Sequence, residues 1–161
     1  MSLRKISLSC VALLVCLVMA QCKKKTTTTE VVDPNVASFQ NMQLHIFKHS
    51  CNSSGCHNTA AASNVQHGLV LEGVDVYERL VNVAPKNADA KNANLRLVVP
   101  NSPDSSFLFT KCAWTSYKFG NQMPLGANAL KANEIEFIKQ WINAGAPKTG
   151  IVADYKLLEA H

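Results

Sequence analysis

The sequence lacks an apolar run long enough to cross a membrane. Its longest run, residues 6–20, has fifteen residues, whereas a membrane-spanning helix needs about 20. Strand-like segments are scarce, since only residues 69–71 and 95–99 have that character and both are short. No internal repeat is visible. With 47% hydrophobic and 17% charged residues, the composition is that of a globular protein, and we expect one domain of the all-α class.

A clustered basic surface is also missing from the part of the chain that should fold. The net charge is +5, but Arg4, Lys5 and residues 23–25 supply five of the sixteen Lys and Arg residues. The remaining basic residues balance the eleven acidic ones. Proteins that bind nucleic acid neutralise its phosphates with clustered cations, so no nucleic-acid partner is expected.

The N-terminal segment predicts export from the cell. Arg4 and Lys5 precede the apolar run, which is the order found in a secretory signal. Cys22 follows directly, and residues 23–29 form a polar, unpatterned stretch that suits a tether.

The segment resembles a bacterial lipoprotein signal, although Gln21 stands where such signals have Gly, Ala or Ser. That resemblance implies removal of residues 1–21, acylation of Cys22, a tether over residues 22–33 and a periplasmic or cell-surface location. Ordinary cleavage after Ala20, with an incidental Cys22, is the alternative.

Apolar periodicity and capping residues predict the helices. Asp33 as N-cap and Pro34 at the first helical position open the first helix, which leads into residues 51–57. Further helices are predicted over residues 74–83, 102–112 and 133–144, with loops over 84–94 and 113–128. The expected core consists of Phe39, Phe47, Leu97, Phe107, Leu108, Ile135, Ile138 and Trp141.

Residues 51–57, CNSSGCH, place two thiols and an imidazole close together at the end of the first predicted helix. The shorter pattern Cys-x-x-Cys-His is the attachment signature of c-type haem, in which two thioether bonds hold the porphyrin and the adjacent histidine reaches the iron from one face. Here four residues separate Cys51 from Cys56, and the small residues between them allow the longer loop. We therefore expect one covalent haem c, bonded to Cys51 and Cys56 and ligated by His57.

Met123 is the expected second iron ligand. It lies in GNQMP, a loop sequence with Gly120 and Pro124, 66 residues after His57. A methionine sulfur favours ferrous over ferric iron, so a His/Met pair raises the reduction potential and suits electron transfer.

Several further pieces together resemble the single-haem class I cytochrome c domain, including the planctomycete-type variety found in exported bacterial proteins. They are Ile46-Phe47, Cys56-His57, GLVL at 68–71, VPNSPDSS at 99–106, Met123-Pro124 and WINAGAP at 141–147. The resemblance implies a small helical domain over residues 34–149, packed around one covalent haem with long loops, and a C-terminal tail over 150–161. It also implies His57 and Met123 as the two iron ligands. The expected activity is single-electron transfer with a redox partner protein rather than catalysis.

Two other readings of the motif remain open at this point. Cys51, Cys56 and His57, with His45 or His49, have spacing compatible with zinc, or the two cysteines could form a disulfide in a haem-free structural lipoprotein. A peroxidase-like enzyme would instead leave one face of the iron open.

Cys112 has no assigned role. It is expected to be a buried thiol, with a bridge to Cys51 as the alternative. Three residues, Arg96, Trp114 and Tyr117, are of types that could contact haem propionates.

Overall fold

The protein is all-α. The computed structural model describes residues 31–52, 56–59, 68–113 and 118–159, so Cys22, the expected signal and most of the tether lie outside the described residues. The described helices are α2 (Ser38–Met42), the π-helix η1 (Gln43–Cys51), α3 (Val76–Leu80), α4 (Ala88–Asn92), the 3₁₀ turn η4 (Pro103–Ser105), α5 (Phe107–Ala113), α6 (Ala132–Asn143) and α7 (Lys156–Glu159). Among the described residues there are only isolated β-bridges, such as Val81 with Val98, in place of strands.

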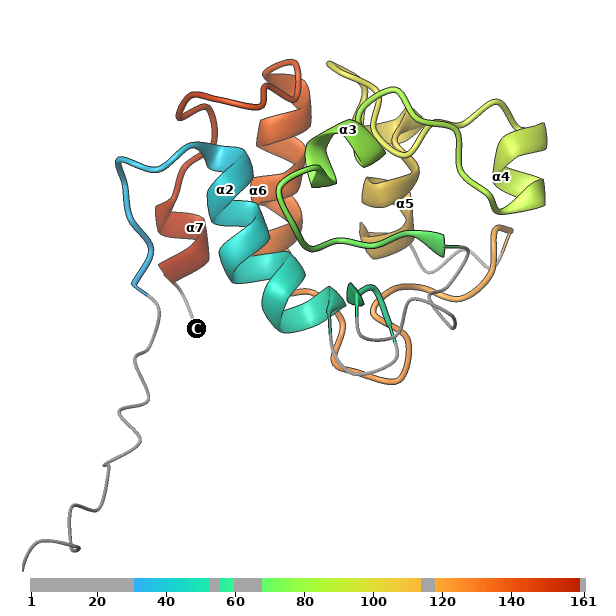
Figure 1. Cartoon of the computed structure of the whole chain (residues 1–161), viewed down its shortest axis with the longest axis horizontal. Coiled ribbons are helices and arrows are strands. Elements are labelled where there is room, and N and C mark those ends of the chain that lie inside the picture. The colour runs from blue at the N-terminus through green and yellow to red at the C-terminus, as the bar shows by residue number, and fades with distance from the viewer. Residues whose placement is uncertain (1–30, 53–55, 60–67, 114–117, 160–161) are drawn as a thin grey trace, which may run out of the picture.

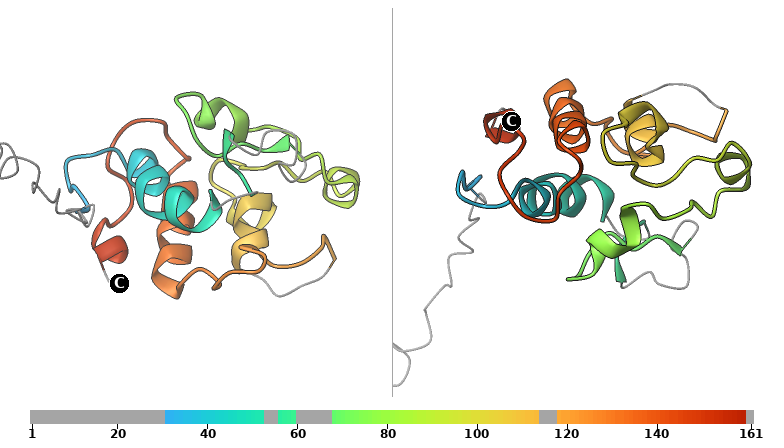
Figure 2. Two further views of the ribbon diagram at one scale, coloured as in Figure 1. Left: turned by 60° about the horizontal axis from the view of Figure 1, so that its bottom comes forward. Right: turned by 90° about the horizontal axis from the view of Figure 1, so that it is seen from above.

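Phe39 joins three helices in the core. Its ring lies 5.4 Å from that of Trp141 on α6 and meets the ring of Tyr77 on α3 edge to face at 5.3 Å. Trp141 is fully buried, and its indole N–H donates to the carbonyl of Pro147 at 2.9 Å. The pairing brings α2 against α6, and η1 continues from the end of α2, as Figures 1 and 2 show.

The start of the first helix differs from the prediction. Asp33 forms a turn in which its carboxylate accepts from the backbone N–H of Asn35 at 2.8 Å, and the helix begins at Ser38. Asp33 therefore satisfies a local turn instead of capping a helix, as Asp side chains often do. From Gln43 to Cys51 the helix is of the π type, a rare form that is frequent at functional sites.

The middle of the chain contains one helix that was not predicted, whereas the helix predicted over residues 74–83 spans only Val76–Leu80 as α3. Residues 84–94, expected to be a loop, contain α4, which is capped by the side chain of Asn87 accepting from the N–H of Ala90 at 2.9 Å. The helix predicted over 102–112 is present as η4 followed by α5. Figures 1 and 2 place α4 at the end of the molecule away from α7.

The predicted last helix is confirmed as α6, which ends before Gly145 at φ 92°. Its buried face includes Phe137, which the prediction omitted, whereas Ile135 is only partly buried. The other predicted core residues are buried, except Leu97, which packs partly buried against the core.

The segment expected to be a C-terminal tail packs on the domain. Leu158 of α7 is fully buried, and the hydroxyl of Ser38 accepts from the N–H groups of Val152 and Ala153 at 2.9 and 3.0 Å. Residues 150–159 thus belong to the folded unit. Within the described residues, every helix is too short or too polar to span a bilayer.

Candidate functional site

A single large cavity brings together the residues that the sequence singled out. It has a volume of about 630 Å³, and Cys51, Cys56, His57 and Met123 all line it. Its apolar wall includes Leu69, Leu71, Leu80, Leu97, Phe107 and Leu108. Sites for small ligands and cofactors usually enclose about 300–1,000 Å³ and are lined mostly by apolar side chains, so the cavity has the size and character of a cofactor site.

One side of the cavity is the end of η1 and the loop that follows it. Cys51 is the last residue of η1, and its carbonyl accepts from the N–H of His57 at 3.1 Å. The side chain of Asn58 donates to the carbonyl of Asn52 at 3.0 Å, and that of Asn52 donates to the carbonyl of Leu71 at 3.1 Å. These bonds hold both described ends of the four-residue gap, so Cys51 and His57 have defined positions although the gap is longer than in the common motif.

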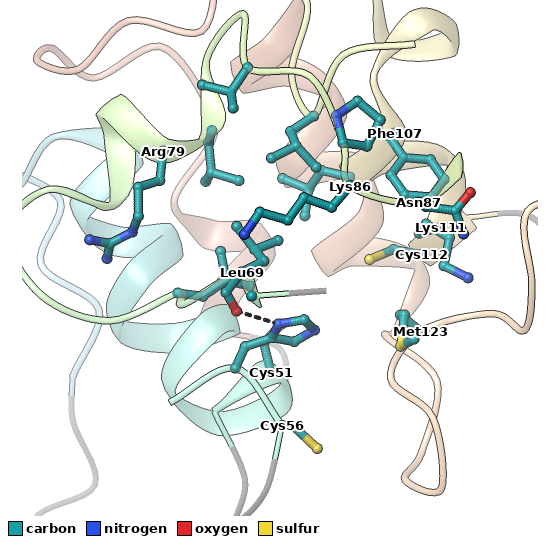
Figure 3. A pocket seen from close by; sticks show the side chains of 18 of the residues that line it. Cys51, Cys56, Leu69, Arg79, Lys86, Asn87, Phe107, Lys111, Cys112 and Met123 are labelled. Atoms are coloured by element: carbon teal, nitrogen blue, oxygen red, sulfur yellow. Dashed lines mark hydrogen bonds between the residues drawn. The ribbon is translucent and has the colours of Figure 1, made fainter. Parts of the chain in front are cut away.

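His57 is oriented through one ring nitrogen. Its Nδ1 lies 2.7 Å from the carbonyl oxygen of Leu69, a hydrogen bond drawn as a dashed line in Figure 3. A carbonyl only accepts, so Nδ1 carries the proton and Nε2 keeps its lone pair in the neutral ring. Histidines that bind metals are usually oriented in this way by a carbonyl or carboxylate. The backbone supports the same pairing, because the N–H of Leu71 donates to the carbonyl of His57 at 2.7 Å.

Met123 lies on the other side of the cavity, beside α5 (Figure 3). Its N–H donates to the carbonyl of Lys111 at 2.8 Å, and the side chain of Gln122 donates to the carbonyl of Cys112 at 2.7 Å. The ammonium group of Lys111 in turn donates to the carbonyls of Phe119 and Asn121. The loop is therefore attached to the C-terminal end of α5 at Met123 itself and at the residues that precede it.

Cys112 lines the same cavity and is 4% exposed. Burial raises the pKa of its thiol to about 12, against the attraction of the nearby Lys111 ammonium. Burial also raises the pKa of Cys51 far above its usual range, with a smaller contribution from Cys112. Among the described cysteines, no disulfide joins Cys51, Cys56 or Cys112, so the expectation that Cys112 is a buried thiol agrees with the structure.

The residues considered for zinc do not gather around one point. The described part of the chain contains no group of three or more His, Cys, Asp or Glu side chains arranged to hold a metal ion. His45 is buried on η1. Of the residue types considered for propionates, Arg96 does not line the cavity, whereas Trp114 and Tyr117 lie outside the described residues.

Several residues that shape the site were not identified from the sequence. They are Leu69, which orients His57, Gln122 and Lys111, which hold the Met123 loop, and Lys86, which lines the cavity. The one sequence signal that could have identified any of these residues is that Gln122 directly precedes Met123. A backbone carbonyl such as that of Leu69 carries no signature in side-chain identity.

The donors around the cavity fit a c-type haem. Such a haem needs two thiols for thioether bonds, a histidine with an available nitrogen and a second axial ligand, all next to an apolar cavity. Cys51, Cys56, His57 and Met123 supply these groups, and the hydrogen bond to Leu69 leaves Nε2 of His57 as the nitrogen that could bind iron. Comparison of the chain with protein-family models, curated proteins and solved structures found no significant match.

Proposed function

We propose that this protein is a monohaem c-type cytochrome that transfers single electrons on the outer side of a bacterial membrane, to which Cys22 would anchor it through a lipid. The observation that carries the proposal is the convergence of Cys51, Cys56, His57 and Met123 on one apolar cavity, although Met123 is distant from the other three in the sequence. Haem iron carries one electron by alternating between the ferrous and ferric states.

Each residue has a separate task in this proposal. The thiols of Cys51 and Cys56 would hold the porphyrin by thioether bonds, and His57 would bind the iron through Nε2 while Leu69 fixes the ring orientation. Met123 would supply the second iron ligand, and the hydrogen bonds of its loop to α5 restrict its movement. A thioether sulfur stabilises the ferrous state and raises the potential. The apolar wall would limit the access of water to the iron, which would favour electron transfer over reaction with small molecules.

The two other readings have less support. A disulfide between Cys51 and Cys56 is absent from the described residues, as is a cluster of zinc ligands. A peroxidase-like enzyme would need one open face of the iron, and Met123 lines the cavity in which that face would lie.

The decisive experiment is production of the full chain in bacteria that express the cytochrome c maturation machinery. We expect haem that stays with the protein after acid-acetone extraction, and a low-spin ferric spectrum with the weak red band of methionine ligation. Variants Cys51→Ala and Cys56→Ala should each retain a single thioether bond, and the double variant should have none. Wild-type protein without covalent haem would refute the proposal, and a high-spin ferric spectrum would favour the enzyme.

A further inference from the structure

Only some of the charged residues that line the cavity have a partner of opposite charge among the described residues. Four of them line it: Glu78, Arg79, Lys86 and Lys111. Glu78 forms an ion pair with Lys148. Arg79 forms an ion pair with Asp75 and donates to the backbone carbonyls of Val70 and Glu72.

The two lysines differ from Glu78 and Arg79 because, among the described residues, neither forms an ion pair. Lys111 donates only to backbone carbonyls, and among the described residues no carboxylate is paired with Lys86 or Lys111. The cavity therefore presents two positive charges without a described counter-ion. A low-dielectric wall strengthens their attraction for an anion, so a ligand with acidic groups fits this cavity better than a neutral one.

Lys86 is held in a position to meet such a ligand. Pro85 before it is buried, and Asn87 after it caps α4 and donates to the carbonyl of Phe119 at 3.4 Å. Lys86 has an exposed side chain, yet it extends across the cavity toward Leu69 (Figure 3).

The end of this side chain fits against a glycine. A Cβ atom at Gly68 would lie only 2.8 Å from the ammonium nitrogen of Lys86, and the backbone at Gly68 has φ 68°. Gly68 therefore leaves room for the Lys86 ammonium beside the segment that orients His57.

We propose that Lys86 binds a carboxylate of the cofactor, namely a propionate group of the haem, and that it is a positioning residue for the porphyrin. This inference rests on the proposed function. Haem has two propionates, and the two lysines of the cavity would balance their charge. Lys86 is the better test of the pair because Lys111 also holds the loop of Met123.

The first experiment measures the reduction potential of the holoprotein with Lys86→Gln. The matched control is Lys91→Gln, which removes the same charge from an exposed position on α4 that does not line the cavity. A cation near the haem favours the ferrous state, so Lys86→Gln should lower the potential more than Lys91→Gln does. The difference should shrink as salt is added, because salt screens exposed charges. Equal shifts in the two variants would overturn the inference.

The second experiment identifies the group that Lys86 contacts. The full chain with Cys51→Ala and Cys56→Ala is titrated with iron protoporphyrin IX and with its dimethyl ester, which lacks both carboxylates. Adding Lys86→Gln should weaken binding of the diacid by about two- to fivefold, as expected for a partly exposed ion pair, and leave binding of the diester unchanged. Equal losses for both porphyrins would refute the carboxylate contact. If the cysteine-free protein binds neither porphyrin, the reduction potentials of the holoproteins decide whether Lys86 contacts the haem. Absence of covalent haem from the wild type would instead contradict the proposed function.

Discussion

The imidazole of His57 and the backbone carbonyl of Leu69 form a 2.7 Å hydrogen bond that determines which ring nitrogen is available for iron. The bond connects the end of the Cys51–His57 motif to a segment twelve residues later, and the N–H of Leu71 donates back to the carbonyl of His57. A single rotation of the ring would break the first bond. The ligand nitrogen of the proposed haem site is thus selected by backbone geometry.

Gly68→Ala should disturb this relationship. Alanine at φ 68° costs about 1–2 kcal/mol of stability, and its Cβ would displace the Lys86 ammonium. The matched control is Gly150→Ala, which has a positive φ of 95° and no side-chain neighbour within 4 Å. Both variants should unfold at lower temperature. Only Gly68→Ala should change the electron paramagnetic resonance spectrum of the ferric protein, and an unchanged spectrum would show that this backbone does not orient His57.

Met123→Ala should remove the distal ligand without removing the haem. We expect the weak red band of the ferric protein to disappear while the haem stays covalently attached to Cys51 and Cys56. The control is Met42→Leu, a substitution of similar volume in the fully buried core, which cores tolerate at a cost of less than about 1.5 kcal/mol. The band should remain in this control. If it also remains in Met123→Ala, another residue ligates the iron.

Gln122→Ala should loosen the loop of Met123. The lost hydrogen bond to the carbonyl of Cys112 is worth about 1 kcal/mol. The state in which Met123 is detached from the iron should therefore be populated about fivefold more. Added imidazole should accordingly bind the ferric protein about fivefold more tightly, as measured by absorption titration. Gln140→Ala removes a side-chain amide that bonds Asp154 and Glu136 and should leave this affinity unchanged. Equal affinities in the two variants would contradict a role for Gln122 in holding the loop.

Cys112 should react very slowly in the folded apoprotein. Because burial raises its pKa from 9.0 to about 12, its thiolate fraction at neutral pH is about 1,000-fold below that of an ordinary thiol. Iodoacetamide with peptide mapping should therefore label Cys56 well before Cys112. When the holoprotein is denatured without reductant, iodoacetamide should alkylate Cys112. Cys51 and Cys56 should not react, because their sulfur atoms would be bonded to the haem. A Cys112 that reacts only after reduction would instead indicate a bridge to Cys51.

The same shift predicts how apoprotein stability depends on pH. The folded-state pKa of Cys112 lies above its unfolded value, so the unfolded chain loses this proton first as the pH rises. The contribution of Cys112 to stability is complete below pH 9 and declines as the pH increases toward about 12. Urea unfolding should show a weaker decline over this range in Cys112→Ala than in the parent protein, and equal slopes would contradict the pKa shift.

Local sequence signals predicted some parts of the fold well. The apolar spacing of residues 133–144 and the stop at Gly145 correspond to α6 because helix periodicity and a glycine at positive φ are local properties. Asp33 shows the limit of such signals. An Asp before a Pro can cap a helix or close a turn, and here the start of the helix depends on distant contacts, since the N–H of Ser38 donates to the carbonyl of Gly150 at 2.9 Å.

The chemistry of the candidate site was visible in residue identities, since Cys51, Cys56, His57 and Met123 carry sulfur and nitrogen donors in suggestive local contexts. Their convergence depends on packing, because α2, which leads into η1, rests on α6 through Phe39 and Trp141 while hydrogen bonds attach the Met123 loop to α5. Lys86 shows why this step needs three dimensions. The residues around Lys86 in the sequence resemble a solvent-exposed loop. Its position at the cavity depends on the path of the backbone between α3 and α4 and on the space beside Gly68.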